Sequence, residues 1–386
     1  MDINDALFHT GEGSAFTDIP ASPAIYQTSN FVFNTFEDMQ ACLEHEDKSP
    51  FYSRGANPTV QTLQKKLAAL EQTEEALVFG SGSAAVAAAI MSQVQAGDHI
   101  TCVANPYGWT KKLLNTILQG YGVTHDFVPA HDTDALLAAV KPETRVIFLE
   151  SPNSWTYEMQ DLERVAAFAK QKGITTIIDN SCASPLNQQP AKYGIDIMVH
   201  SASKYLSGHA DMVAGVLCTS SKMAKQIFQG PYMTLGGILS PFESWLMIRS
   251  LRTLEMRMDR VASNALVVGE YLENHPKVTK LYFTHAKSYP QPELRDKYLK
   301  KAGGLMTIEL DTTELEQVKS FCNALKRFKL GCSWGGFESL AFPAATTTGS
   351  LNYHSDDTPV NRVRLYVGLE NPELLIEDLS NAFDAL

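Results

Sequence analysis

The sequence predicts an α/β protein in which a mostly parallel sheet forms a large domain and a smaller α+β unit follows. Two observations lead to this class. Short apolar runs alternate with amphipathic helical patterns between residues 76 and 218, an order typical of parallel strands covered by helices on both faces. After Ser240 and Pro241 the pattern changes to one long helical stretch and then to fewer strands, which indicates a second unit.

The first 56 residues predict an extended arm and not a domain. Pro20 and Pro23 precede an alternating apolar segment, Phe31-Val32-Phe33, in an otherwise irregular stretch. Arms of this kind often cross to another copy of the chain, so we expect residues 1–56 to contact a neighbouring subunit.

Residues 57–245 are predicted to form the large α/β domain. Apolar side chains recur at helical spacing over residues 59–71, and a short apolar run follows at 76–79. The later strands are predicted at 99–103, 146–149, 175–178, 197–200 and 215–218, and the helices between them at 84–94, 111–118, 133–140 and 162–172.

Residues 246–386 are predicted to form the smaller α+β domain. A helical pattern runs from residue 242 past residue 272 and reads as a connector between the domains. Strands are then predicted at 305–310 and 363–368, with helices near 315–327 and 372–383.

Composition excludes several classes of protein. The formal net charge is -11, and no Lys/Arg run offers a patch for nucleic acid or an anionic membrane. No stretch of about 18 apolar residues exists. The six cysteines are scattered, with no C-x-x-C pair, which suggests neither a metal site nor a disulfide framework. The first residues do not have the pattern of a signal peptide, so we expect a cytoplasmic protein.

Lys204 is the first candidate for chemistry. It follows a predicted strand and is flanked by Ser201, Ser203 and Gly208. Small neighbours leave room for a cofactor ring, and the serine hydroxyls can donate hydrogen bonds to phosphate oxygens. The alternative is a surface lysine in a polar loop, and this segment alone does not decide between the two.

Asp179 is the second candidate, because it ends the apolar run Thr175-Thr176-Ile177-Ile178. Ligands in parallel α/β sheets bind at the carboxyl ends of strands. A carboxylate there can pair with a protonated pyridine nitrogen and keep a pyridoxal phosphate ring electron-withdrawing. Its alternative role is to cap a loop or a helix.

The third candidate is the small-residue turn around Gly82, between a predicted strand and a helix. Backbone N–H groups at such a helix start can bind a phosphate. The segment from Gly80 to Ala85 also satisfies the G-x-G-x-x-A fingerprint of dinucleotide-binding oxidoreductases. Against that rival, the strand at 99–103 is followed by Ala104 and Asn105, with no acid for a ribose, and the Lys204 segment stays unexplained.

Taken together, these segments resemble the Cys/Met-metabolism family of pyridoxal-phosphate enzymes, which includes cystathionine lyases and synthases and methionine γ-lyase. The resemblance covers nearly the whole chain. Besides the Lys204 segment, its motifs are Tyr26-Gln27-Thr28-Ser29, Tyr52-Ser53-Arg54, Ser240-Pro241-Phe242, Leu251-Arg252-Thr253-Leu254 and Arg364-Leu365-Tyr366-Val367-Gly368-Leu369-Glu370. It implies the aminotransferase-like architecture known as fold type I.

The resemblance also implies roles for single residues. Lys204 is similar to the lysine that holds the cofactor as a Schiff base, Asp179 to the partner of the pyridine nitrogen, and Tyr107 to a tyrosine stacked on the ring that helps in catalysis. The residues that match phosphate ligands are Gly82, Ser83, Ser201 and Ser203. Ser203 replaces the usual threonine, and Ala210 stands where a small polar residue is common.

Three further matches concern the substrate and the neighbouring subunit. Arg364 resembles the arginine that grips the substrate carboxylate with two parallel hydrogen bonds. Tyr52 and Arg54 resemble residues that reach the phosphate of an adjacent subunit, which implies a homotetramer built as a dimer of dimers. For the arginines the alternative is a surface salt bridge, and for the tyrosines ordinary packing.

The segment Cys332-Ser333-Trp334 bears on the reaction, because it looks most like bacterial cystathionine β-lyases. Ser333 and Trp334 would then contact the substrate, although Trp334 could be core packing. Methionine γ-lyase has a cysteine soon after its tyrosine, where this chain has Gly108-Trp109-Thr110. The resemblance therefore favours elimination of a thiol from L-cystathionine or a related cysteine conjugate. The alternatives are a γ-lyase or γ-synthase of the same family and a binding paralogue without turnover.

Overall fold

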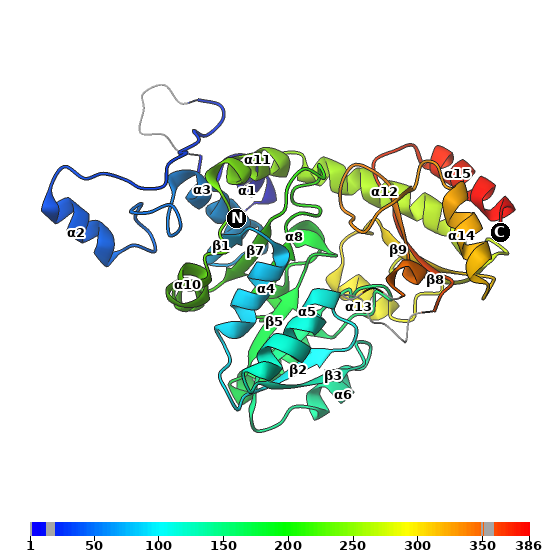
Figure 1. Ribbon diagram of the computed structural model, residues 1–386, viewed down its shortest axis with the longest axis horizontal. Helices are drawn as coiled ribbons and strands as arrows, with labels where there is room; N and C mark the ends of the chain where they lie inside the picture. The colour runs from blue at the N-terminus through cyan, green and yellow to red at the C-terminus, as the bar shows by residue number, and fades with distance from the viewer. Residues whose placement is uncertain (1, 13–19, 349, 351–358) are drawn as a thin grey trace.

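A seven-stranded sheet forms the centre of the large domain (Figure 1). The computed structural model describes residues 2–12, 20–348, 350 and 359–386. The strand order is β1-β7-β6-β5-β4-β2-β3, and only β7 runs antiparallel to its neighbours. The strands are β1 (Glu75–Phe79), β2 (His99–Val103), β3 (Thr124–Val128), β4 (Thr144–Glu150), β5 (Thr175–Asp179), β6 (Ile197–Ser201) and β7 (Gly215–Thr219). The expectation of a mostly parallel sheet is confirmed.

Both faces of this sheet are buried, which explains why its strands are continuous apolar runs in the sequence. Along β4, Ile147 and Leu149 belong to one apolar cluster, and Val146 and Phe148 belong to the cluster on the opposite face. Helices α3 (Pro58–Glu71), α7 (Leu162–Lys172) and α11 (Pro241–Leu251) contribute to the first cluster, and α4 (Gly82–Met91) contributes to the second.

The first strand of the sheet is entered from α3, whose start is encoded locally. Asn57 accepts a hydrogen bond from the Thr59 N–H at 3.0 Å and Pro58 occupies the first helical position.

The other helices of the large domain are α5 (Gly108–Lys112), α6 (Thr133–Ala138), α8 (Ser184–Asn187), α9 (Ser221–Ile227) and α10 (Met233–Leu235). Leu113–Leu118 extends α5 as a wider π-helical segment.

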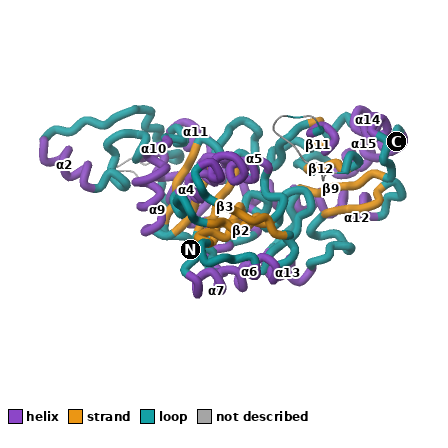
Figure 2. Tube along the Cα trace, turned by 60° about the horizontal axis from the view of Figure 1, so that its bottom comes forward, coloured by secondary structure: helices purple, strands orange, loops and turns teal. Residues whose placement is uncertain are grey.

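The N-terminal arm contains two helices that the sequence did not predict. Helix α1 (Ile3–Phe8) packs against α3, and its Ala6 and Leu7 are buried in the core of the large domain. Helix α2 (Phe36–Glu44) lies at the far end of a long loop, away from both sheets (Figure 2). Only the later part of residues 1–56 therefore has the character of a projecting arm.

The long helical stretch after Pro241 is two helices, α11 and α12 (Leu254–Glu273). The break at Arg252 and Thr253 has a local cause, because side chains take the carbonyl groups that a continuous helix would use. Thr253 Oγ1 donates to the Ser250 carbonyl at 3.2 Å, and Arg257 donates to the same carbonyl at 3.0 Å. Met247, on α11, still packs in the core of the large domain, beyond the boundary predicted at residue 245.

The small domain is a five-stranded sheet of order β10-β11-β12-β9-β8 with helices against it. Its strands are β8 (Val278–Tyr282), β9 (Leu305–Leu310), β10 (Lys329–Leu330), β11 (Leu340–Pro343) and β12 (Arg362–Tyr366). Its helices are α12, α13 (Pro292–Tyr298), α14 (Leu315–Ala324) and α15 (Pro372–Asp384). Of the helices in the described part of the chain, none is long and apolar enough to cross a membrane.

Gly215, the first residue of β7, allows the turn at Ser81 and Gly82 to lie directly against the sheet. A Cβ atom added at Gly215 would lie 2.0 Å from the Ser81 carbonyl oxygen. We expect Gly215→Ala to lower the free energy of unfolding by about 1–3 kcal/mol, because backbone must move to make room. Urea denaturation measures this difference.

Gly120→Ala is the matched control, because a Cβ there meets nothing within 4 Å. It should leave stability unchanged or raise it slightly, since alanine restricts the unfolded chain. Equal unfolding midpoints for wild type and Gly215→Ala would contradict the packing argument.

Candidate active site

Lys204 lies where the two domains meet. It follows β6 in the large domain, and its Nζ donates a hydrogen bond of 2.7 Å to Ser333 Oγ in the small domain. The same Nζ lies 5.5 Å from the centre of the Trp334 ring. Gly335 makes this approach possible, since a Cβ there would lie 2.9 Å from the Lys204 Cα, and its φ of 83° suits glycine.

Burial lowers the pKa of the Lys204 amine, and the positive charge of Arg364 lowers it further. The opposing influence of Cys332, Cys182 and Asp179 is smaller. Both dominant causes favour the neutral amine, which is the form that acts as a nucleophile or a base.

Tyr205, the residue after Lys204, is held by hydrogen bonds to α12 and to the small domain. The Tyr205 carbonyl accepts a hydrogen bond of 2.8 Å from Arg257 on α12, and the Tyr205 hydroxyl accepts one of 2.8 Å from the Gly304 N–H. The Tyr205 ring meets the Trp334 ring edge to face at 5.3 Å. The backbone of the lysine loop is therefore fixed by both the connector helix and the small domain.

Asp179 ends β5 and is 8% exposed. Its Oδ1 accepts hydrogen bonds from the Ser181 N–H at 2.9 Å and the Ser181 hydroxyl at 2.5 Å, and Ser181 Oγ in turn accepts the Ser201 N–H at 2.6 Å. Burial raises the pKa of Asp179, and the two bonds from Ser181 oppose that rise.

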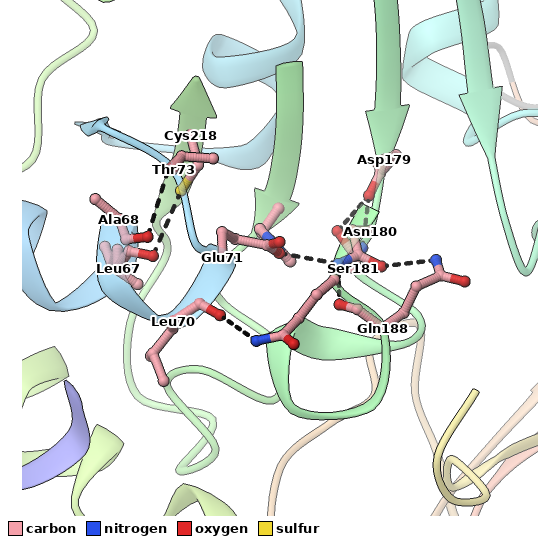
Figure 3. A network of polar contacts seen from close by, with 12 residues as sticks. Leu67, Ala68, Leu70, Glu71, Thr73, Asp179, Asn180, Ser181, Gln188 and Cys218 are labelled. Carbon is pink, nitrogen blue, oxygen red and sulfur yellow. Dashed lines mark hydrogen bonds and ion pairs between the residues drawn. The ribbon is translucent and has the colours of Figure 1, made fainter. Parts of the chain in front are cut away.

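A buried polar network fixes the strand end next to Asp179 (Figure 3). Asn180 donates to Glu71 Oε1 at 2.9 Å and to the Gln188 carbonyl at 3.0 Å. The Glu71 oxygen also lies 2.5 Å from His200 Nε2 on β6. Hydrogen bonds stabilise buried polar groups of this kind, so the network holds β5, β6 and α3 in one arrangement.

Glu150, at the end of β4, is a second buried carboxylate, 3% exposed. It accepts the Tyr107 N–H at 2.7 Å, the Ser154 N–H at 2.7 Å and the Ser154 hydroxyl at 2.5 Å. Burial and the nearby Asp179 raise its pKa to about 8. Tyr107 is 41% exposed and begins α5.

The first residue of α4, Gly82, packs against Ser201, the last residue of β6. A Cβ at Gly82 would lie 2.9 Å from both Cα and Cβ of Ser201, so the backbone at Gly82 and the Ser201 side chain share one small space. Ser83 is exposed beside Gly82. The Ser203 hydroxyl accepts a hydrogen bond from the Ala214 N–H at 2.9 Å and donates one to the Ala214 carbonyl at 3.3 Å.

Arg364, on β12, lies against a pair of aromatic rings, Trp155 and Phe342, whose centres are 5.7 Å apart. Its guanidinium carbon is 5.0 Å from the centre of Phe342 and 5.5 Å from that of Trp155, and it donates a hydrogen bond of 2.6 Å to the Cys332 carbonyl. Trp155 has a φ of 69°, which is rare for a residue with a large side chain. The rings and the carbonyl together orient the guanidinium plane.

Tyr52 and Arg54 lie in the arm, with the Arg54 guanidinium 5.5 Å from the Tyr52 ring. Both are exposed, and within the described residues no hydrogen bond joins either of them to Lys204 or Asp179. The other predicted residues are brought together around the end of the large sheet.

Sequence reasoning missed five residues that shape this site: Glu150, Ser181, Trp155, Tyr205 and Arg257. Glu150 had a usable signal, because it ends an apolar strand just as Asp179 does. The other four act through backbone contacts or across the domain junction, and no local pattern encodes such contacts.

The donor set fits pyridoxal phosphate. Lys204 offers an amine for the aldehyde, and Asp179 a carboxylate for the ring nitrogen; among the described residues, its Oδ2 receives no hydrogen bond. The N–H groups at the start of α4 and the Ser201 hydroxyl suit the phosphate.

Comparisons with known proteins agree with this fit. The family model described as Cys/Met metabolism PLP-dependent enzyme matches residues 6–384. An L-methionine gamma-lyase from Fusobacterium nucleatum is 37% identical over 94% of this chain and 93% of its own length. A cystathionine beta-lyase from Lactococcus lactis is 35% identical over 99% of each chain.

A solved structure also agrees with a pyridoxal phosphate site. A putative O-acetylhomoserine (thiol)-lyase from Campylobacter jejuni, solved with N'-pyridoxyl-lysine-5'-monophosphate, superposes with a TM-score of 0.93 at 26% identity over 100% of both chains. The chain belongs to the Cys/Met-metabolism family of pyridoxal-phosphate-dependent enzymes.

Proposed function

We propose that this enzyme eliminates the thiol from L-cystathionine, or from related cysteine S-conjugates, to give homocysteine or another thiol, pyruvate and ammonia. The observation that carries the proposal is the contact of Ser333 and Trp334 with Lys204, at 2.7 Å and 5.5 Å from its Nζ. This pair is the part of the sequence that resembles bacterial cystathionine β-lyases, and it lies beside the proposed base.

Pyridoxal phosphate, when bound, supplies a ring that withdraws electrons from the substrate Cα. Lys204, as a neutral amine, would take the Cα proton, and Asp179 would hold the protonated ring nitrogen. Arg364 would bind the substrate carboxylate, so that Cα faces Lys204. Expulsion of the thiolate at Cβ would then complete the elimination.

The remaining predicted residues have supporting roles in this proposal. Tyr107 would lie over the ring and orient the amine. Gly82, Ser83, Ser201 and Ser203 would bind the phosphate, with Ser203 also bracing the loop through Ala214. Ser333 would position Lys204, and Trp334 would exclude water from the amine.

A methionine or cystathionine γ-lyase is the second candidate. The specific observation in its favour is that methionine γ-lyases from Fusobacterium nucleatum and Pseudomonas putida are 37% and 36% identical to this chain. The end-to-end match with the Lactococcus lactis β-lyase, over 99% of both chains, supports β-elimination.

The arm supports a proposal about assembly. Val32 and Phe36 are 90% and 76% exposed, and α2 projects from the body of the chain. We propose that the arm packs on a second subunit, that Tyr52 and Arg54 complete that subunit's phosphate site, and that the enzyme is a cytoplasmic homotetramer.

The product of the reaction distinguishes the two candidates. Purified enzyme incubated with L-cystathionine should release pyruvate, because loss of the Cβ substituent leaves a three-carbon keto acid. Chromatography of the keto acids measures it. A product consisting of 2-oxobutyrate would contradict β-elimination and establish a γ-lyase.

Lys204→Ala controls this assay. It should lose turnover by several orders of magnitude, about 10⁴-fold or more, because covalent attachment and the base are removed together. Borohydride reduction of the wild-type enzyme should label Lys204, and retained activity in the variant would contradict its assignment.

Trp155→Leu should raise KM for the amino acid by about 2- to 30-fold, with a smaller effect on kcat. The reason is that a guanidinium on an aromatic face is stabilised by about 0.5–2 kcal/mol, and Arg364 would lose one of its two rings. Steady-state kinetics measures both constants.

Tyr282→Leu is the matched control. It removes the ring 5.1 Å from Arg362, two residues from Arg364 on β12 and outside the proposed site. It should leave KM unchanged, and equal effects of the two variants would indicate general damage to the strand.

Light scattering should give a mass four times the 42.5 kDa of one chain. Phe36→Asp should shift the enzyme to smaller species, because a charge would replace an apolar contact, while Tyr121→Asp, at a residue 70% exposed outside the arm, should not. A monomeric wild-type enzyme would contradict the proposed assembly.

A further inference from the structure

Glu150 and Asp179 form a pair of buried carboxyl groups at the ends of adjacent strands. They are register partners on β4 and β5, 3% and 8% exposed. Register partners in a sheet point to the same face, and neighbouring strands lie about 4.8 Å apart. The proposed mechanism uses Asp179 and leaves Glu150 without a role.

The hydrogen bonds of Glu150 join two loops that are far apart in the sequence. Oε2 accepts the Tyr107 N–H at 2.7 Å. Oε1 accepts both the N–H and the hydroxyl of Ser154, at 2.7 Å and 2.5 Å. Each oxygen therefore serves one loop.

Both loops lead to groups of the site. The first carries Tyr107, proposed to lie on the cofactor ring. The second carries Trp155, the residue after Ser154, which lies 5.5 Å from the guanidinium of Arg364. A substitution of Glu150 would therefore alter the position of Tyr107, on the cofactor side of the site, and of Trp155, on the substrate side.

A carboxylate suits this position better than an amide. Three donors converge on its two oxygens and favour the ionised form, against burial and Asp179, which raise the pKa of Glu150 to about 8. An amide has only one acceptor oxygen, so glutamine would turn an N–H₂ group toward one set of donors. An unsatisfied buried donor costs about 1–3 kcal/mol. This cost favours a second acid beside Asp179 although each acid disfavours ionisation of the other.

We propose that Glu150 is a positioning residue that sets Tyr107 over the cofactor and Trp155 against Arg364 with one carboxylate. The inference rests on the proposed roles of Tyr107 and Arg364. It does not depend on which carbon–sulfur bond the enzyme breaks.

The test is visible circular dichroism of the holoenzyme without substrate, together with kinetics. Glu150→Gln should weaken the cofactor's dichroic band, normalised to bound cofactor, and should lower kcat/KM by about 10- to 100-fold. Glu158→Gln is the matched control, because the Glu158 carboxylate is eight residues further on and contacts Asn153 Nδ2 and His131 Nδ1, not Tyr107. It should retain the wild-type band.

A double-mutant cycle separates positioning from general stability. In a Tyr107→Ala background, Glu150→Gln should cause little further loss of the dichroic band, because the residue through which it acts is gone. Effects of the two changes that add fully, or a wild-type band in Glu150→Gln, would overturn the proposal.

Ser154→Ala provides a second test that keeps Glu150 intact and removes one donor, so it stays informative even if Glu150→Gln fails to fold. It should raise KM for the amino acid while leaving the dichroic band unchanged, because only the Trp155 side is loosened. Unchanged KM would overturn the link to Arg364. Since the band is recorded without substrate, failure here is distinguishable from a wrong product in the elimination assay.

Discussion

The close approach of the small domain to Lys204 is the constraint on which the candidate site depends. Gly335 has no side chain, and any Cβ there would collide with the backbone of Lys204 and Tyr205. The approach brings Ser333 and Trp334 to the lysine amine and partly buries it, and burial lowers the pKa of that amine. A lysine that was merely exposed at the end of β6 would carry its ordinary charge and could not act as a base near neutral pH.

The carboxyl ends of three parallel strands supply the other half of the site. β4, β5 and β6 end at Glu150, Asp179 and Ser201, and water is largely excluded from the first two. Ser154 and Ser181, in the loops that follow β4 and β5, donate to these carboxylates, and Glu150 also accepts the Tyr107 N–H. These hydrogen bonds offset the cost of burying the carboxyl groups. The network of Glu71, Asn180 and Gln188 extends this order to the layer beneath the site.

The sequence predicted the large sheet well because its central strands are apolar on both faces and therefore conspicuous. Four strands were missed: β3, β8 and β10, which are edge strands with exposed or half-buried residues, and β11, which has only four residues. The sequence pattern singled out Lys204 and Asp179 because each follows or ends an apolar strand, and the structure places both at strand ends of the large sheet. Their roles, and that of Arg364, which rests on resemblance, stay predictions. Arg257 and Trp155 could not be predicted, because their contacts cross from one domain or loop to another. The roles of Tyr52 and Arg54 stay predictions that involve a second chain.

Arg257 ties the connector helix to the lysine loop through the Tyr205 carbonyl, and the helix continues into the small domain, which also carries Arg364. The proposed base follows a strand of the large domain, and the proposed carboxylate ligand lies on a strand of the small domain. A turn of the small domain on its connector would therefore change the distance between proton acceptor and carboxylate anchor, and the hydrogen bond from Arg257 opposes that turn.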